Sequence, residues 1–333
     1  MKACAATVVL LLAYVSHVSL ACPPLCKCYP RRAEVVCNQV PLTSFPSEGL
    51  PRNTSTLTIQ FTNITSITEQ DLEATPHLKE LHLFNNRLKN LSSHLLRGVP
   101  HLTALDLTGN ELTHLPADVF SHAPLRSLVL KNNLMEIADA GWIPDNSNLT
   151  WLDISGNRLT KIPADFLQKM PQLESLDFSN NLLETISANA LNQLTKLERL
   201  NLRNNKLDAL DVSILAGTRN LTYLFLSRNR LTHLPENIFQ ELTQLKHLSL
   251  DDNKLSNIPT GLLDNLESLD AEGLDLTANP WLCNGQLEYL FRWLQKNQTT
   301  LFLPETITCS GPQSLKSRSV MSLTESELNL QAS

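Results

Sequence analysis

Leucine and other aliphatic residues recur along this chain with one fixed spacing. The template Leu-x-x-Leu-x-Leu-x-x-Asn-x-Leu is first complete at Leu78, Leu81, Leu83, Asn86 and Leu88. Later copies place an asparagine 23 or 24 residues after the preceding one, at Asn110, Asn133, Asn157, Asn181, Asn205, Asn229 and Asn253. Degenerate copies around Leu57 and Leu274 bring the count to ten. A period of this length is typical of repeats that stack on one another.

Each unit combines two kinds of apolar position. The leucines at the fourth and sixth positions alternate, which predicts a short strand with one buried side. The asparagine turns the chain, and its amide can hydrogen-bond the backbone of neighbouring coils. A second apolar pair, predicted to close the core from the convex side, follows at Leu95-Leu96, Val119-Phe120, Trp142-Ile143, Phe166-Leu167, Ile214-Leu215, Ile238-Phe239 and Leu262-Leu263. The pattern is that of leucine-rich repeats, and it predicts an α/β solenoid: a horseshoe with a parallel β-sheet on its concave face.

The N-terminus is typical of exported proteins. Lys2 precedes an apolar run that ends in small residues before Cys22, which predicts a signal peptide over 1–21. A retained signal anchor is disfavoured because the run is short for a membrane span. The C-terminal residues are polar, so no lipid-anchor signal follows. We therefore expect a secreted protein of the extracellular space.

Six cysteines follow the predicted signal peptide. Four lie close together, at Cys22, Cys26, Cys28 and Cys37, and two lie near the other end, at Cys283 and Cys309. An even number in an exported chain predicts disulfides, although spacing alone leaves three pairings open for the first four. A zinc site at Cys26 and Cys28 is disfavoured because no histidine lies nearby.

The chain is expected to have four parts. We predict the signal peptide at 1–21, a cysteine-rich cap at 22–52, the repeats at 53–278, and a C-terminal cap and tail at 279–333. In the last part, Leu287, Leu290, Phe291 and Leu294 have the i, i+3, i+4, i+7 spacing of a buried helical face. Six Asn-x-Ser/Thr sequons predict a glycoprotein, at Asn53, Asn63, Asn90, Asn148, Asn220 and Asn297.

Two segments of the C-terminal cap resemble one particular family. Leu-Asp-Leu-Thr-Ala-Asn-Pro-Trp-Leu-Cys and the following Leu-Phe-Arg-Trp-Leu-Gln are similar to the leucine-rich alpha-2-glycoprotein family of secreted leucine-rich-repeat glycoproteins. The four-cysteine cap is a departure, since it looks like the general extracellular type. These resemblances imply the pairs Cys22–Cys28 and Cys26–Cys37 and a C-terminal cap with the single bridge Cys283–Cys309. They also imply a protein that binds transforming-growth-factor-beta receptors, or an accessory receptor, and modulates their signalling.

The strand positions that alternate with the buried leucines predict where a partner binds. The third, fifth, seventh and eighth positions of each unit are expected on the concave face. They hold aromatic and arginine side chains, which dominate the energetics of many interfaces. The predicted contact residues are Phe84, Asp106, Trp151, Asp153, Asp177, Arg199, Arg203, Tyr223, Phe225 and Arg228. Asp153 and Asp177 are interpreted as an acidic patch, because an open sheet is expected to offer no desolvation that would support acid catalysis.

Other classes of function are disfavoured. The net charge of −6 lacks the basic footprint of a nucleic-acid-binding protein. No catalytic or nucleotide-binding motif is present, and the histidines are scattered without ligand-like pairing, so we expect neither an enzyme nor a cofactor or metal. Two alternatives remain: a matrix protein like the small leucine-rich proteoglycans, and an innate-immune recognition protein. The sequence does not set the oligomeric state.

Overall fold

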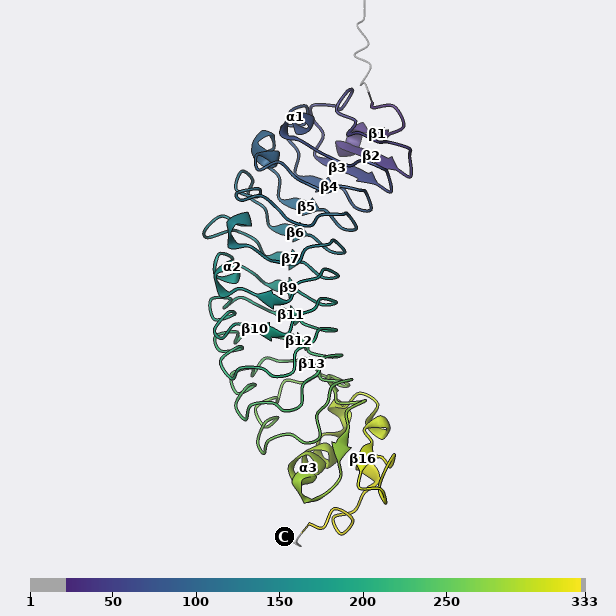
Figure 1. Ribbon diagram of the computed structural model, residues 1–333, viewed down its shortest axis with the longest axis vertical. Helices are drawn as coiled ribbons and strands as arrows, with labels where there is room; N and C mark the ends of the chain where they lie inside the picture. Colours follow the sequence, from purple (N-terminus) through teal and green to yellow (C-terminus); the bar gives the residue numbers. More distant parts are fainter. Residues whose placement is uncertain (1–21, 331–333) are drawn as a thin grey trace, which may run out of the picture.

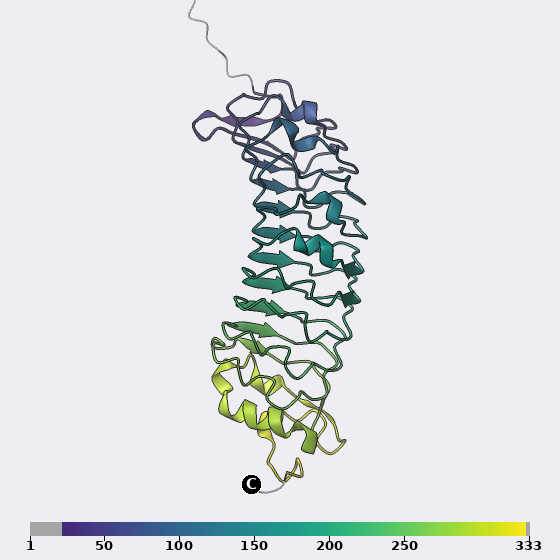
Figure 2. The same ribbon diagram turned by 90° about the vertical axis from the view of Figure 1, so that its left-hand side faces the viewer.

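The structure is a computed structural model that describes residues 22–330. The predicted signal peptide at 1–21 lies outside the described residues. The chain forms an elongated, bowed stack of coils (Figure 1). Strands line one side of this stack, and the short helices α1 (Glu69–Leu72) and α2 (Ala164–Gln168) lie on the other (Figure 2). The predicted leucine-rich-repeat solenoid is confirmed.

Twelve strands form one sheet along the inner side of the bow. In sheet order they are β1 (Lys27–Tyr29), β2 (Glu34–Asn38), β3 (Thr56–Gln60), β4 (Glu80–His82), β5 (Ala104–Asp106), β6 (Ser127–Val129), β7 (Trp151–Asp153), β9 (Ser175–Asp177), β11 (Arg199–Asn201), β12 (Tyr223–Phe225), β13 (His247–Ser249) and β14 (Leu274–Asp275). Only β1 and β2 pair in antiparallel fashion, and every later pair in this sheet is parallel. Two strands on the outer side, β8 (Lys161–Ile162) and β10 (Thr185–Ile186), form a separate parallel pair.

The core runs the length of the stack between the sheet and the outer segments. Leu78, Leu81 and Leu83 are fully buried, and the same positions of later units repeat this burial. The second apolar pair is buried as predicted, and Trp142 packs edge-on against Phe166 of the next coil with ring centroids 5.8 Å apart. Each buried leucine contributes about 1.5–3 kcal/mol, but only while the neighbouring coil covers it. The two ends of the stack therefore need caps.

Disulfides close both caps. Cys22–Cys28 and Cys26–Cys37 tie the segment before β1 to β1 and β2, and Cys283–Cys309 joins the residue after β15 (Trp281–Leu282) to β16 (Cys309–Gly311). These are the pairings that the resemblance implied. The expected C-terminal helix is α3 (Glu288–Lys296), which follows a single 3-10 turn, Gly285–Leu287. Its buried side carries Leu290, Phe291 and Leu294, as the sequence spacing predicted.

The remaining helical segments are single 3-10 turns. They lie at Pro30–Arg32, Leu95–Gly98, Ala140–Trp142, Gln298–Thr300, Pro304–Thr306 and Val320–Ser322. Beside the backbone–backbone hydrogen bonds between coils, the asparagine of each regular unit pairs further backbone groups. Asn110, for example, donates to Leu83 O and Leu107 O, both at 2.9 Å, and accepts from Leu88 N at 3.0 Å. The predicted asparagine ladder is present from coil to coil.

Candidate functional site

The strand register lines up equivalent residues of successive units on the concave face. Third-position residues form the row Trp151, Ser175, Arg199, Tyr223 and His247 across five neighbouring strands. Fifth-position residues form the row Val129, Asp153, Asp177, Asn201, Phe225 and Ser249. Neighbouring members of a row are one strand spacing apart, about 4.8 Å. Residues 24 positions apart in the sequence therefore act as one surface.

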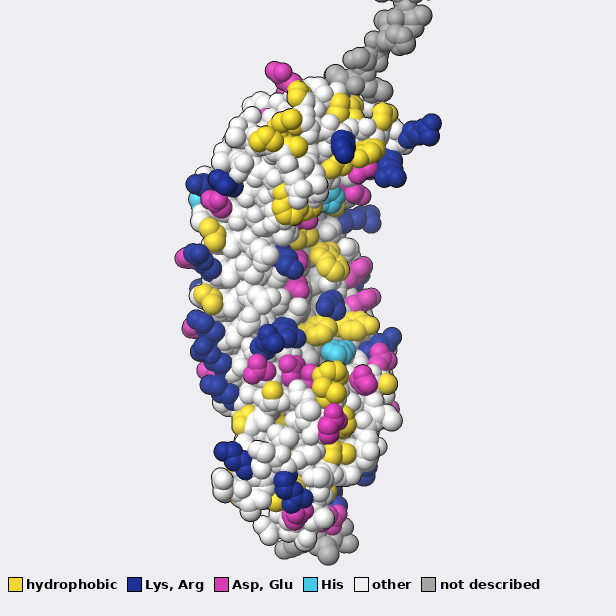
Figure 3. Space-filling model, turned by 90° about the vertical axis from the view of Figure 1, so that its right-hand side faces the viewer, with side chains coloured by type: hydrophobic (Ala, Val, Ile, Leu, Met, Phe, Trp, Pro, Cys, Tyr) yellow, Lys and Arg dark blue, Asp and Glu magenta, His cyan; other side chains and the backbone are white. Residues whose placement is uncertain are grey.

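Four of these residues form an aromatic–arginine cluster on β11, β12 and β13. The Arg199 guanidinium lies 4.5 Å from the centre of the Phe225 ring and 5.8 Å from that of Tyr223. His247 packs on the other side of Phe225, with ring centroids 5.1 Å apart. Cation–π contacts of this kind hold a long side chain in place. The cluster is therefore an ordered surface, and Figure 3 shows hydrophobic and basic side chains gathered side by side on the inner side of the bow.

Two large aromatic side chains on this face are exposed. Trp151 on β7 is 45% exposed, and Tyr223 within the cluster is 39% exposed. Large apolar rings of this exposure mark interaction surfaces when they gather in one place. At the N-terminal end, the predicted residue Phe84 packs edge-on against Phe61, with centroids 5.9 Å apart.

The acidic patch lies between these aromatic groups. Asp153 and Asp177 are paired across β7 and β9, and Asn201 of β11 donates to Asp177 at 2.8 Å. Each carboxylate also accepts a hydrogen bond from a backbone N–H two residues later, Ser155 N or Ser179 N, both at 2.8 Å. Asp106 on β5 does the same with Thr108 N at 2.9 Å. These aspartates therefore cap the strand ends.

The expectation that an open sheet offers no desolvation was wrong for Asp153. Burial raises the pKa of Asp153, and the neighbouring Asp177 carboxylate adds to this, against the opposing hydrogen bonds from Ser155. Burial likewise raises the pKa of Asp275 and lowers the pKa of His247. The sheet is curved and lined by large side chains, so its inner surface is partly shielded from water.

We expect Asp153→Asn to stabilise the protein slightly near neutral pH. The amide keeps an oxygen for Ser155 N but removes a charge that faces Asp177, so the free energy of unfolding should rise by about 0.5 kcal/mol. A raised pKa means that the folded protein disfavours the charged form of Asp153. Protonation removes this cost, so the difference in stability between variant and wild type should shrink as the pH falls to about 3.5. Asp106→Asn is the matched control, because Asp106 lies between His82 and Val129 instead of a carboxylate. Thermal melts at both pH values test this. An equal gain in the control would contradict it.

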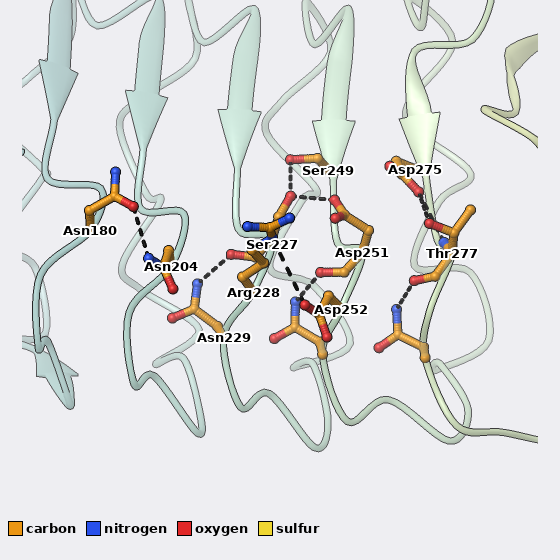
Figure 4. Close-up of polar contacts among 12 residues, drawn as sticks. Asn180, Asn204, Ser227, Arg228, Asn229, Ser249, Asp251, Asp252, Asp275 and Thr277 are labelled. Carbon is orange, nitrogen blue, oxygen red and sulfur yellow. Dashed lines mark hydrogen bonds and ion pairs between the residues drawn. The ribbon is translucent and has the colours of Figure 1, made fainter.

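Polar residues at and beyond the strand ends contact one another from coil to coil (Figure 4). Asn204 donates to Asn180 at 2.8 Å, the hydroxyl oxygens of Ser227 and Ser249 are 2.8 Å apart, and Ser227 donates to Asp251. Ser227 and Ser249 are buried, so these contacts join neighbouring coils beneath one rim of the sheet.

Arg228 does not lie on a strand, which corrects its expected placement. The eighth position is a turn residue with a left-handed backbone: φ is 55° at Asn180, 55° at Asn204 and 53° at Arg228. Asparagine tolerates this conformation better than most residues do. The Arg228 side chain pairs with Asp252 at 3.9 Å on the rim, whereas Arg203 lies just beyond β11 and is half-buried.

Four of the histidines, which look scattered in the sequence, are stacked in two pairs. His77 and His101 are stacked with ring centroids 6.4 Å apart, and His94 and His122 with centroids 5.8 Å apart. Both pairs link neighbouring coils. Within residues 22–330, no group of three or more histidine, cysteine, aspartate or glutamate side chains has the arrangement to hold a metal ion.

The sequons lie away from the strands. Asn53, Asn63, Asn90, Asn148 and Asn220 are exposed, and Asn297 follows the end of α3, where its side chain donates to Trp293 O at 2.9 Å. None of the six belongs to the rows of the concave face.

Two members of this surface were not predicted from the sequence. His247 holds the third position of its unit, so the row Trp151, Ser175, Arg199, Tyr223 pointed to it. Phe61 belongs to the degenerate first unit, where the template is too weak to place it.

No helix among the described residues has the length and apolar character needed to cross a membrane.

The fold and this face define a leucine-rich-repeat solenoid of the kind that mediates protein–protein binding. The family model "Leucine rich repeat" matches residues 52–112, 100–159, 147–207 and 219–280, which together exceed half of the chain. The chain belongs to the leucine-rich-repeat family.

Two curated relatives match a short part of the chain. "Phospholipase A2 inhibitor beta" of Elaphe climacophora is 45% identical over 64 residues, 19% of each protein. "Phospholipase A2 inhibitor" of Gloydius brevicaudus siniticus is 41% identical over 78 residues, 23% of each. The matched part of the chain thus spans about a fifth of the length of these relatives.

A solved structure matches nearly the whole chain. It is a chain of the "Octameric complex of Latrophilin 3 (Lec, Olf), Unc5D (Ig, Ig2, TSP1) and FLRT2 (LRR)", with a TM-score of 0.77 and 25% identity. The match covers 93% of this chain and 100% of that one.

Proposed function

We propose that this protein is a secreted glycoprotein that binds protein partners through its concave face and modulates transforming-growth-factor-beta receptor signalling. The observation that carries the binding proposal is the ordered aromatic–arginine cluster near Trp151, in which Tyr223 is exposed and the other members are half-buried. Aromatic and arginine side chains on a rigid sheet lose little conformational freedom on binding. The receptor class rests on the resemblance to the leucine-rich alpha-2-glycoprotein family. We also propose that the chain has the four parts predicted from its sequence and that the six sequons carry glycans.

The proposal is tested by binding to immobilised transforming-growth-factor-beta receptor ectodomains and to their accessory receptor. The full-length secreted protein should bind, and Trp151→Ala/Phe225→Ala should weaken this affinity by about 100-fold, as expected when two central aromatic anchors are lost. Ile137→Ala is the control, because Ile137 is 64% exposed but lies outside the strands. All variants should keep the wild-type melting temperature.

The outcomes separate the site from the partner. Binding that survives the double substitution would overturn the concave site. The absence of binding to every ectodomain would overturn the receptor class and leave the concave site to be judged with another partner.

Inhibition of phospholipase A2 is a second candidate, favoured by the 41–45% identity to two phospholipase A2 inhibitors. If this candidate holds, the purified protein should inhibit a phospholipase A2, and Trp151→Ala/Phe225→Ala should relieve the inhibition. Unchanged hydrolysis at micromolar protein would overturn it.

A further inference from the structure

A notch interrupts the concave surface between Trp151 and Tyr223. The hollow measures about 270 Å³, and Ser175 and Arg199 lie between the two aromatic residues in the third-position row. Ser175 is small and buried, so its strand leaves room where the neighbouring strands carry large side chains. The volume falls below the range of about 300–1,000 Å³ that is typical of pockets for drug-sized molecules. It suits one side chain of a partner.

The edge of the notch is acidic. Glu174 and Glu198, at the second position of adjacent units, line the hollow and are exposed. Neither carboxylate takes part in any ion pair formed within residues 22–330. Two free carboxylates beside exposed aromatic rings are the combination that holds a cation.

Arg199 is not the cation that these two carboxylates hold. Its guanidinium lies over the rings of Phe225 and Tyr223, at 4.5 and 5.8 Å, on the β12 side of the notch. With two glutamates and one arginine, the lining carries a net charge of about −1. The Trp151 side of the notch is left for an incoming group.

We propose that the notch receives an arginine side chain of the protein partner. The guanidinium stacks on the Trp151 ring and pairs with Glu174 and Glu198. This inference rests on the proposed binding through the concave face and adds the chemistry of the partner's anchor. Arginine fits better than lysine because its planar guanidinium both stacks on aromatic rings and forms bidentate bonds with carboxylates. An anionic side chain would face two glutamates.

The direct test needs no partner protein. N-acetyl-L-arginine methylamide is titrated into the full-length secreted protein carrying 5-fluorotryptophan, with the matching citrulline compound as an uncharged probe of the same shape. The fluorine resonance of Trp151 is assigned with Trp151→Phe, since the chain has four tryptophans. We expect the arginine compound to shift this resonance with a dissociation constant of about 1–10 mM, and the citrulline compound to bind at least about tenfold more weakly.

Matched substitutions assign the effect to the notch. Glu174→Gln/Glu198→Gln should weaken binding of the arginine compound by about tenfold or more without changing the melting temperature, because both side chains are exposed. Glu184→Gln is the control, since Glu184 is an exposed glutamate outside the sheet. Equal binding of the two compounds, or no effect of the paired substitution, would overturn the proposal.

Failure of the notch and failure of the proposed function give different results. If the ectodomains bind, Trp151→Ala/Phe225→Ala abolishes this binding, and Glu174→Gln/Glu198→Gln leaves it unchanged, then the notch proposal fails and the concave site stands. If the arginine compound binds in the notch and no ectodomain binds, then the receptor class fails and the notch stands.

Discussion

We expect Gly273→Ala to be among the most destabilising single substitutions in this protein. Gly273 is buried directly before β14, where the last repeat meets the C-terminal cap. A Cβ atom there would lie 2.3 Å from Lys246 O and 2.8 Å from Asp270 O. Both atoms belong to the backbone and cannot move aside as a side chain would. The free energy of unfolding should fall by about 3 kcal/mol or more, the upper range for overpacking a core.

The consequence should be concentrated at the C-terminal end. Gly273 O accepts the hydrogen bond from Leu248 N at 2.8 Å, so moving Gly273 breaks the pairing of β13 with β14. The cap closed by Cys283–Cys309 follows directly, and the end coil of a repeat protein depends on one neighbour only. Amide hydrogen exchange should therefore accelerate first in β14 and α3, and denaturant melts should report the global loss.

Gly285→Ala is the matched control in the same cap. A Cβ atom at Gly285 would have Leu328 O at 3.9 Å as its nearest neighbour, which is ordinary contact. Its effect should stay within about 0.5 kcal/mol. Equal stability of the two variants would show that the close approach at Gly273 is not the constraint inferred here.

The constraint at Gly273 could not be predicted from the repeat pattern. The regular units were predictable because a leucine at a fixed position has one buried place in every coil, as Leu81 and Leu105 do. Between Asn253 and Asn279 the spacing lengthens to 26 residues, and the template no longer says which residues are additional. The backbone approach at Gly273 depends on how this insertion folds against Lys246, which no periodicity encodes.

The positions of the candidate site were largely predictable from the sequence, but the environment of its individual side chains was not. Alternation and register placed Trp151, Arg199 and Phe225 on one face, because the parallel pairing keeps equivalent residues aligned. The desolvation of Asp153 was not predictable, since it depends on the side chains that surround it. The placement of Arg228 was wrong because the eighth position belongs to the left-handed turn. A row of Asn and Gly there, at Asn132, Gly156, Asn180 and Asn204, was the available signal.

The asparagine ladder supports the second large prediction, the loss of Asn157. This buried side chain donates to Leu130 O and Ile154 O, both at 3.0 Å, and accepts from Met135 N at 3.1 Å. It thereby joins its own coil to the preceding one in the middle of the stack. Asn157→Ala leaves the Met135 N–H and the Leu130 carbonyl buried without these partners. Each such group costs about 1–3 kcal/mol, so we expect a total loss of about 3–5 kcal/mol.

The position of Asn157 makes the form of the unfolding curve informative. A break in the middle of a stack weakens the interface between two halves that each keep their own cap, so the single cooperative transition should broaden or split in two. Asn265→Ala is the control, because Asn265 is exposed and makes one hydrogen bond of 3.4 Å to Gln240 O. It should leave the urea midpoint unchanged. If Asn157→Ala unfolds at the wild-type midpoint with one sharp transition, the ladder is not what couples the coils.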